Sequence, residues 1–592
     1  MTRRALLGAL LALFCLSYPA TSRATPQTPF QKPPQTTTKA TPLFPLAALE
    51  PGQTGYALTA GAGNVIERFS VEVLALQHDV GTGFPVVLVR ASGPLITAAG
   101  GIASGMSGSP VYLGHVGRDA LLGAISFTFP ETTGGLGLVT PIATMRRADP
   151  RTRDVAAFGP QFDLGDAVPV RTPLLVSGLS ARASTFLAPL FSDVVAPVPL
   201  QSAGGRADDD AYRLEPGSAV SAQLVRGDVT VAAVGTVTLL EGDAFWAFGH
   251  PLVGRGAVSF ALTPAYVTAL VPSRSVPFKL ADSGQRILGS VTQDRPYAIS
   301  GLLGKKPNFI PVTLRFSGDA GALTKRFEVT DDERFYAPLL AAATLEAFDA
   351  LLQETGAGTA DLAWEIELRG GRTVRVLEQA TSPDDLAFAA AELAAEPLGL
   401  FSGNPFQAAE VERINISATY ARAERVAEIV DAVPERRTLG PGGSLGLNLR
   451  LQPYRAEPQV ERLSVRLPPK LRGALTLTVR GGLTPPEDDA EAPPLLSFAE
   501  LLTALEENVQ SSELVVETTI EGETRVLKRL SLPYLVGGSE QVEVTVRGKR
   551  GAPARAPADE PSPEEAPETP PEDDPLEEGP PLEPSIDLGV GR

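Results

Sequence analysis

Short runs in which apolar and polar residues alternate recur along most of the chain and predict a mainly β protein. Between residues 49 and 145 the runs include GYALTAG, RFSVEVLAL, PVVLVRA and ALLGAISF, with glycine-containing turns between them. Alternation at every second position places the apolar side chains on one face of a strand. The pattern resumes at residue 216 and continues to about residue 316. Many short strands with turn residues between them are typical of barrels and sandwiches.

The C-terminal half combines helical periodicity with further strands. Ser382 is an expected N-cap with Pro383 at the first helical position, and Ser497 with Glu500 forms a capping-box pattern. The segment SLGLNLRLQ places leucines at alternate positions, and RLSVRL and LTLTVR follow it, which predicts a small β-sandwich. A further short helix is expected over residues 181–191. The longer helices are expected over residues 338–354, 382–396 and 497–508.

Both ends of the chain differ from its middle. The basic start MTRR and the apolar run ALLGALLALFCL, followed by Ser22–Ala24, predict a signal peptide over residues 1–24. No later stretch is long and apolar enough to predict an integral membrane segment, so we expect an exported protein, periplasmic or extracellular. The Pro/Glu/Asp-rich tail over residues 551–592 lacks the apolar residues needed for a core and is expected to be disordered.

Composition excludes several classes of function. The net charge of −18 argues against a nucleic-acid-binding protein. The single cysteine, Cys15, would leave with the signal peptide, which excludes disulfides and a cysteine nucleophile in the mature chain. The three histidines lie far apart and form no helical metal-binding pair, so no metal is expected. The stretch GAGNVI lacks the third glycine of a dinucleotide-binding loop, and no cofactor is expected.

The motif GMSGSP, residues 105–110, is the strongest candidate for chemistry. A nucleophilic serine needs a sharp turn, a base within hydrogen-bond reach, and backbone N–H groups that stabilise the oxyanion. Gly105 and Gly108 flank Ser107, and glycine adopts backbone conformations that other residues avoid. The N–H groups of Gly105 and Ser107 are the expected oxyanion hole. The alternative is that the motif is only a tight turn.

The candidate base is His250. It follows the apolar strand AFWAFG and precedes a turn, which places an imidazole at a strand end. His78 and His115 lie in polar, turn-like stretches and are interpreted as exposed loop residues. The alternative for His250 is a buried structural histidine.

Two blocks of the chain resemble the SpoIVB peptidase family of serine peptidases. The first runs from VIERFSVEVLAL through GMSGSPVYLGHVGRDALLGAISF, and the second includes DAFWAFGHPLVGRGAVSF and SGQRILGSVTQDRPYAIS. The resemblance covers about residues 49–311. It implies a chymotrypsin-like double β-barrel with the site between the barrels, Ser107 as nucleophile and His250 as base.

The chain departs from the family in two respects. The serine block precedes the histidine block, the reverse of the order in the sporulation peptidase, which implies a circular permutation. Ser92 occupies the position of the aspartate that precedes the family's serine motif. Asp294, 44 residues after His250, is the candidate carboxylate that orients the imidazole. The alternative interpretation of Asp294 is a turn carboxylate that pairs with Arg295. In that case Ser92 is the alternative residue to orient the imidazole.

The sequence therefore predicts an exported serine endopeptidase that acts on a protein or peptide substrate of the cell envelope or the exterior. The alternative is a weak or inactive peptidase-like module that binds proteins, or an envelope scaffold. The expected fold is mainly β, with a permuted chymotrypsin-like double barrel followed by an α+β region and a sandwich-like domain. The expected parts are the signal peptide (1–24), a Pro/Thr-rich linker (25–44), the peptidase domain (45–320), the α+β region (321–437), the sandwich-like domain (438–550) and the tail (551–592).

Overall fold

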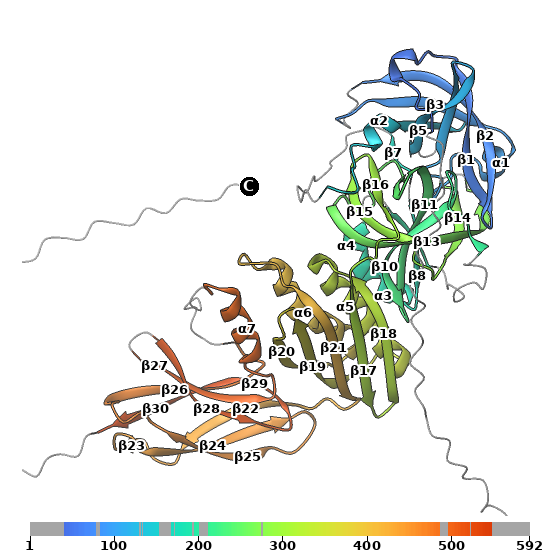
Figure 1. The fold of residues 1–592 in the computed structure, drawn as a ribbon. Helices are drawn as coiled ribbons and strands as arrows, with labels where there is room; N and C mark the ends of the chain where they lie inside the picture. Colours follow the sequence, from blue (N-terminus) through green and yellow to red (C-terminus); the bar gives the residue numbers. More distant parts are fainter. Residues whose placement is uncertain are drawn as a thin grey trace, which may run out of the picture.

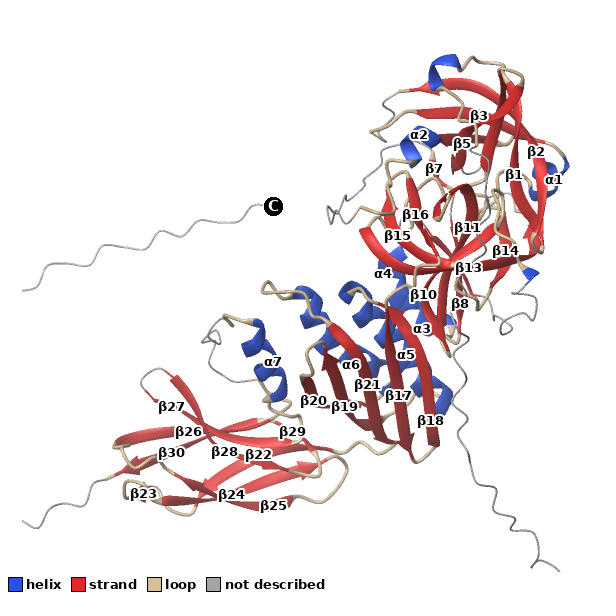
Figure 2. Ribbon diagram, in the orientation of Figure 1, coloured by secondary structure: helices blue, strands red, loops and turns tan. Residues whose placement is uncertain are grey.

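The computed structural model is mainly β, as the alternating pattern predicts, and its longer helices gather in the middle of the molecule (Figures 1 and 2). The predicted signal peptide, most of the linker and the acidic tail lie outside the described residues. The structure describes residues 41–78, 83–129, 132, 134–152, 167–170, 172–191, 195–199, 211–273, 276–485, 495–520 and 523–547.

The first unit is a ring of six strands, drawn in blue and cyan in Figure 1. The strands pair in the order β4-β1-β2-β3-β6-β5, and β5 pairs back with β4, which closes the ring. Alternate residues of β2 and β3, such as Phe69, Val71 and Val89, form its core. The elements are η1 (Leu46–Ala48), β1 (Thr54–Ala62), β2 (Val65–Gln77), β3 (Val86–Ser92), α1 (Pro94–Ala99), β4 (Pro110–His115), β5 (Arg118–Thr128), β6 (Leu136–Pro141), α2 (Ile142–Met145) and β7 (Val168–Pro169), which pairs with β5.

The second unit contains another closed ring of six strands, in green. Its order is β10-β13-β15-β16-β12-β11, with β11 pairing back to β10. The expected short helix over residues 181–191 forms as three short turns that precede this ring. The elements are β8 (Thr172–Ser177), α3 (Ala181–Ser184), η2 (Thr185–Leu187), α4 (Ala188–Phe191), β9 (Val195–Pro199), β10 (Ala219–Gly227), β11 (Thr230–Glu241), β12 (Ala244–Ala247), β13 (Gly256–Val271), β14 (Phe278–Ser283), β15 (Gly289–Arg295) and β16 (Ala298–Leu303).

An α+β unit continues the second ring. Its strands pair in the order β20-β19-β21-β17-β18, and β18 also pairs with β10 of the ring. Two helices pack on one another and on one face of this sheet, where they bury Leu362, Trp364 and Ile366 of β19 (Figure 2). The elements are β17 (Phe309–Gly318), β18 (Gly321–Thr330), α5 (Glu333–Leu352), β19 (Gly358–Leu368), β20 (Thr373–Ser382), α6 (Leu386–Gly403) and β21 (Val411–Ala421).

Two helices start at residues other than those the sequence predicts. Helix α5 begins at Glu333 with Asp332 as its N-cap, so Pro338 lies inside the helix. Helix α6 is capped by Asp385, whose side chain accepts a hydrogen bond from the Phe388 amide. The expected cap, Ser382, instead ends β20. The sequence-based expectation that no later stretch is long and apolar enough to cross a membrane is wrong for helix α5, which is so by length and composition. Most of this apolar stretch, 67%, is buried inside the protein.

The last unit is a β-sandwich, in orange, with one four-stranded and one five-stranded sheet around a common core. The predicted leucine face of β24 is confirmed, since the alternate leucines of this strand are buried. The predicted capping residue Ser497 accepts a hydrogen bond from the Glu500 amide at the start of α7. The elements are β22 (Val426–Pro434), β23 (Thr438–Leu439), β24 (Ser444–Pro453), β25 (Gln459–Arg466), β26 (Gly473–Gly481), α7 (Phe498–Glu506), β27 (Glu513–Ile520), β28 (Glu523–Ser531), β29 (Leu535–Gly537) and β30 (Ser539–Val546).

Three expected domain boundaries fall inside units of the structure. Phe44, assigned to the linker, is buried in the first ring, and its amide donates to the Leu121 carbonyl at 2.9 Å. The boundary at residue 320 lies in the turn between β17 and β18, which pair along their whole length. The boundary at residue 437 follows β22, which already pairs with β24 of the sandwich.

Candidate active site

Ser107 lies in a turn between α1 and β4 of the first ring. Gly105 and Gly108 on either side have φ of +89° and +90°, the left-handed region that favours glycine. The Gly108 amide donates to the Ile125 carbonyl at 2.8 Å, which fixes the turn against β5. A Cβ atom at Gly108 would lie 1.9 Å from the Thr236 carbonyl oxygen, so the turn is packed directly against the second ring. We call residues 104–109 the serine turn.

His250 reaches the same junction from the other side. Strand β12 ends at Ala247, and Phe248 and Gly249 both have positive φ, which turns the chain towards the first ring. The Thr140 hydroxyl of β6 donates to the Gly249 carbonyl at 2.8 Å. The His250 ring lies 6.5 Å from the Phe127 ring, measured between centroids. The histidine of the second ring is therefore inserted among β5 and β6 of the first.

Thr236 of β11 links the two turns. Its amide donates to the Ser107 carbonyl at 2.8 Å, and its carbonyl accepts from the Phe248 amide at 3.3 Å. Ser107 and His250 are both fully buried. Among the described residues, neither Ser107 Oγ nor His250 Nε2 has a hydrogen-bond partner, and they do not bond to each other. An unsatisfied buried polar group costs about 1–3 kcal/mol, and such groups in native proteins call for an explanation.

The His250 ring is held in one protonation form. Its Nδ1 lies 2.7 Å from the Pro251 carbonyl oxygen, which can only accept, so Nδ1 carries the proton and Nε2 keeps its lone pair. Burial lowers the pKa of His250 from 6.5 to about 4, against the opposing effect of the Pro251 and Val170 backbone groups. The ring is therefore neutral at pH 7, as a general base must be.

Asp294 is not the partner of the imidazole. This residue lies in β15 and is fully buried. One carboxylate oxygen accepts from the Leu252 amide at 2.7 Å, and the other from the Val253 amide at 2.8 Å. Burial raises its pKa, and hydrogen bonds from four backbone amides of residues 252–255 oppose that rise. Asp294 thus anchors the loop after His250, whereas its expected orienting bond to Nδ1 is made by the Pro251 carbonyl.

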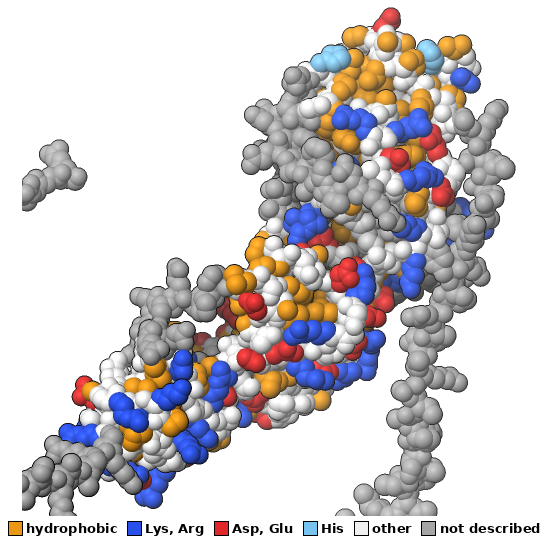
Figure 3. Space-filling view, turned by 60° about the vertical axis from the view of Figure 1, so that its left-hand side comes forward, with side chains coloured by type: hydrophobic (Ala, Val, Ile, Leu, Met, Phe, Trp, Pro, Cys, Tyr) orange, Lys and Arg blue, Asp and Glu red, His pale blue; other side chains and the backbone are white. Residues whose placement is uncertain are grey.

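Ser92 does not orient the imidazole either. It is the last residue of β3, where it is exposed and pairs with Ser70. His78 is exposed, as predicted, and histidine side chains are visible on the surface of the first ring in Figure 3. His115 is half-buried at the end of β4, with its ring 5.3 Å from that of Phe44.

The predicted oxyanion donors have the free N–H groups that the role requires. Within the serine turn, the Met106 amide donates to the Ala103 carbonyl and the Ser109 amide to the Met106 carbonyl. The Gly105 and Ser107 amides donate to none of the described residues. An oxyanion hole requires N–H groups that are not already bonded within the protein, and these two amides meet that requirement among the described residues.

Sequence reasoning missed Lys279, which is also fully buried beside the serine turn. Its stem lies against Gly105, where an added Cβ would be 3.2 Å from Lys279 Cδ. The only sequence signal is a lysine between Phe278 and Leu280 in an otherwise alternating strand, and in an isolated strand that is usually a solvent-facing residue.

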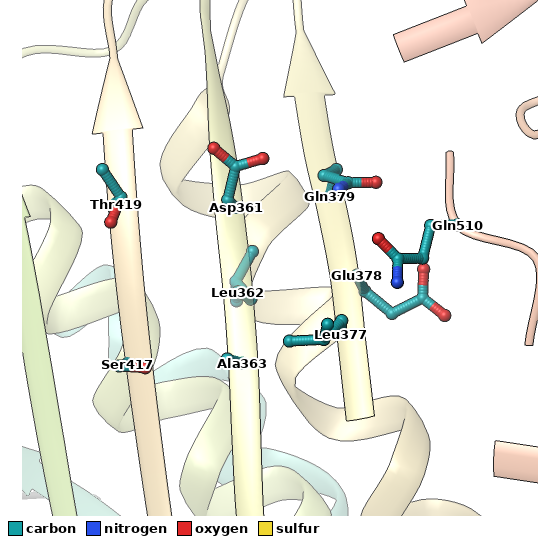
Figure 4. Close-up of a pocket in the computed structure, with 9 residues that line it drawn as sticks. All are labelled: Asp361, Leu362, Ala363, Leu377, Glu378, Gln379, Ser417, Thr419 and Gln510. Atoms are coloured by element: carbon teal, nitrogen blue, oxygen red, sulfur yellow. The ribbon is translucent and has the colours of Figure 1, made fainter. Parts of the chain in front are cut away.

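A shallow pocket of about 250 Å³ lies far along the chain from Ser107, on the α+β sheet (Figure 4). Its charged groups already have partners in the protein: Arg425 donates to Asp361, and Asn508 donates to Glu378. No group of three or more metal-binding side chains occurs among the described residues. Asp361, Leu362, Ala363, Leu377, Glu378, Gln379, Ser417, Thr419 and Gln510 line the pocket.

No family model, curated protein or solved structure matches the chain.

Proposed function

We propose that the protein is an exported serine endopeptidase whose catalytic domain is a permuted chymotrypsin-like double barrel, as its resemblance to the SpoIVB peptidase family implies. One observation carries the proposal. Ser107 from the first six-stranded ring and His250 from the second both lie at the junction of the rings, where the backbone of Thr236 bonds to both turns. Neither Ser107 Oγ nor His250 Nε2 has a hydrogen-bond partner among the described residues. Most buried polar side-chain atoms in native proteins have a hydrogen-bond partner, so two reactive atoms without one at the same junction support a chemical role.

The proposed reaction gives each of these groups one role. His250 Nε2 takes the proton of Ser107 as Oγ attacks the scissile carbonyl carbon. The Gly105 and Ser107 amides stabilise the negative oxygen of the tetrahedral intermediate. Nε2 then gives its proton to the leaving amine, and a water molecule activated by the same nitrogen hydrolyses the acyl-enzyme.

The Pro251 carbonyl takes the structural part of the usual aspartate role. It fixes the ring orientation and the Nδ1–H form through its 2.7 Å contact. A neutral carbonyl stabilises the imidazolium less than a carboxylate does, so we expect slow turnover. In serine proteases, loss of the triad carboxylate lowers kcat by about 10⁴-fold.

The test is labelling of the purified mature protein with a fluorophosphonate probe, followed by peptide mapping. The probe should attach to Ser107 alone. Ser107→Ala should abolish labelling, and His250→Ala should reduce it to near the same level because the two residues act together. Ser92→Ala, at an exposed strand end, is the matched control and should label normally. Normal labelling of Ser107→Ala would refute the proposal.

The second candidate is a peptidase-like domain that binds protein segments without cutting them. It is favoured by the complete burial of both reactive side chains and by the contact of His250 Nδ1 with a backbone carbonyl where a triad histidine has a carboxylate. If the wild-type protein neither labels nor cleaves, and a peptide ligand binds wild type and Ser107→Ala equally, this second function replaces the first.

A further inference from the structure

Lys279 is a buried lysine that forms no salt bridge with any of the described residues. It is fully buried in β14, and no carboxylate oxygen of the described residues lies within 4.0 Å of Nζ. The neighbouring core is made of small apolar residues, and a methionine there would avoid the cost of burying an amine. That core contains Ala60, Leu175, Ala219, Ala232, Val234, Ala265, Val267 and Ala281.

The backbone at Lys279 holds the start of the serine turn. The Lys279 amide donates to the Ser104 carbonyl at 2.9 Å, and the Ser104 amide donates to the Pro277 carbonyl at 2.7 Å. In a trans peptide the C=O and the following N–H point in opposite directions. Fixing the Ser104 carbonyl towards β14 therefore turns the Gly105 N–H away from it, where that donor stays unbonded.

The Lys279 side chain also fixes the next peptide unit, between Gly105 and Met106, through the hydroxyl of Thr236. Lys279 Nζ donates to Thr59 Oγ1 at 2.6 Å and, more weakly, to Thr236 Oγ1 at 3.5 Å. The Thr236 hydroxyl donates its single proton to the Gly105 carbonyl at 3.0 Å, so it can only accept from Lys279. The Thr236 amide also holds the Ser107 carbonyl.

Through these two hydrogen bonds the Lys279 side chain links the first ring to the second beside the serine turn. Thr59 belongs to β1 of the first ring and Thr236 to β11 of the second, while Lys279 lies between them. Burial lowers the pKa of Lys279 from 10.5 to about 7, and the charge of Glu67 opposes that change. The amine is thus expensive to keep at this position, which a role in packing alone does not require.

We propose that Lys279 is the positioning residue of the serine turn: through Thr236 it holds the Gly105 carbonyl, and with it the Gly105–Met106 peptide that joins the two proposed oxyanion donors, the Gly105 and Ser107 amides. This inference rests on the proposed peptidase function for its catalytic consequence. The anchoring itself can be measured without catalysis.

The first arm of the experiment measures the rate of fluorophosphonate labelling in four variants. Lys279→Met keeps the length of the stem and removes the donor, and Thr236→Val keeps the shape and removes the hydroxyl. Each should slow labelling about 10²-fold, as expected for a displaced oxyanion donor. The double variant should be no slower than the slower single variant, because both act on one carbonyl. Thr236→Ser, which restores the hydroxyl, should label at close to the wild-type rate.

The second arm measures backbone hydrogen exchange of residues 103–109 at pH 7 in the full-length protein. Lys279→Met and Thr236→Val should both accelerate exchange in this segment, whereas the control Lys325→Met should not. Lys325 is also a largely buried strand lysine, but it bonds to the Gly178 carbonyl and pairs with Glu346, away from the serine turn.

The outcomes separate the two proposals. Unchanged exchange in Lys279→Met, a wild-type labelling rate, or additive effects in the double variant each overturn the role of Lys279. A wild-type protein that never labels, together with accelerated exchange in Lys279→Met, refutes the peptidase and keeps the anchoring role. If Lys279→Met does not fold, the comparison of Thr236→Val with Thr236→Ser decides whether the Thr236 hydroxyl, which accepts from Lys279 and donates to the Gly105 carbonyl, positions the turn.

Discussion

Among the individual residues of the site, His250 differs from a triad histidine in what its Nδ1 contacts. The 2.7 Å contact is to the carbonyl of its own neighbour, Pro251. The carboxylate selected from the sequence, Asp294, bonds to the amides of the loop instead. Sequence spacing can nominate a carboxylate, but a backbone carbonyl is present at every residue and leaves no signal. For this reason the nucleophile and base are candidates readable from the sequence, and the orienting group is not.

Burial of His250 sets the expected acid limit of activity. Because its pKa is lowered to about 4, Nε2 stays unprotonated well below the ordinary value of 6.5. We expect the labelling rate of Ser107 to be flat from pH 8 to about pH 5 and to fall near pH 4. A pH–rate profile of probe labelling checks this. A fall centred at pH 6.5 would mean that the reacting state exposes the imidazole to water.

The same shift makes stability depend on pH even without catalysis. The pKa of His250 is about 4 in the folded protein and 6.5 in the unfolded chain. Between pH 4 and pH 6.5 the unfolded chain therefore binds a proton that the folded protein does not. The stability contributed above pH 6.5 is therefore lost as the pH falls to 4, by about 3 kcal/mol. Urea unfolding of wild type and His250→Gln at pH 7 and pH 4.5 should show a smaller pH-dependent loss in the variant. An equal loss of unfolding free energy between pH 7 and pH 4.5 in the two proteins would contradict the conclusion that the His250 imidazole is buried and neutral.

Replacing Asp294 by asparagine distinguishes an anchor from a triad member. Asparagine keeps one acceptor oxygen but presents an NH₂ group to the amides of the loop, so we expect a loss of about 2–3 kcal/mol in stability. Labelling should fall together with the melting temperature, and its acid limb should stay near pH 4 because Pro251 still holds Nδ1. Labelling reduced by about 10⁴-fold at an unchanged melting temperature would instead assign Asp294 to the triad.

At the scale of elements, the two glycine-rich turns at the junction of the rings are fixed by backbone contact. A Cβ at Gly108 would lie 1.9 Å from the Thr236 carbonyl oxygen and 2.5 Å from the Phe248 nitrogen, and neither backbone atom can move alone. The turn therefore holds the second ring against the first as well as presenting Ser107.

Replacing Gly108 by alanine should push the serine turn away from the backbone of the second ring. We expect a loss of about 3 kcal/mol or more in stability, from backbone overlap added to the strain at φ of +90°. Gly117→Ala is the matched control, since Gly117 has φ of +70° in the β4–β5 turn and nothing lies within 4 Å of an added Cβ. Gly117→Ala should lower the free energy of unfolding by only about 1 kcal/mol. Thermal melts of both variants check the difference, and equal costs would mean that strain alone makes Gly108 necessary.

The elements that the sequence predicted well are those whose pattern is set by local burial. The leucines of β24 alternate because one face of a sandwich sheet is buried and the other is not. The sequence predicts too early a start for α6 because Ser382 and Asp385 are both good N-caps, and the choice between them depends on where β20 stops pairing with β19. Helix α5 contains Pro338 because packing against α6 compensates for one missing hydrogen bond.

At the scale of the whole molecule, the second ring and the α+β unit share one core. The buried cluster runs from Val231 of β11 through Phe335 of α5 to Trp364 of β19, whereas the sandwich has a separate cluster. Pairing of β18 with β10 continues the sheet across the expected boundary. Sequence patterns show where strands occur, but they do not show which distant strands pair, so the boundary at residue 320 was not readable.

This continuity predicts how the chain tolerates truncation. A fragment of residues 41–320 ends between β17 and β18, so it loses the strand that pairs with β10 and leaves the core of the second ring without Phe335 and the rest of α5. We expect it to aggregate or to lack a cooperative melt. A fragment of residues 41–425 keeps both rings and the α+β unit, and it should fold and label at Ser107. It loses α7, whose Phe498 ring lies 6.0 Å from Phe401 of α6, so its melting temperature should be lower than that of the full chain. Circular dichroism melts and probe labelling of the two fragments test this. A folded, labelled 41–320 fragment would show that the rings form a complete domain without the α+β unit.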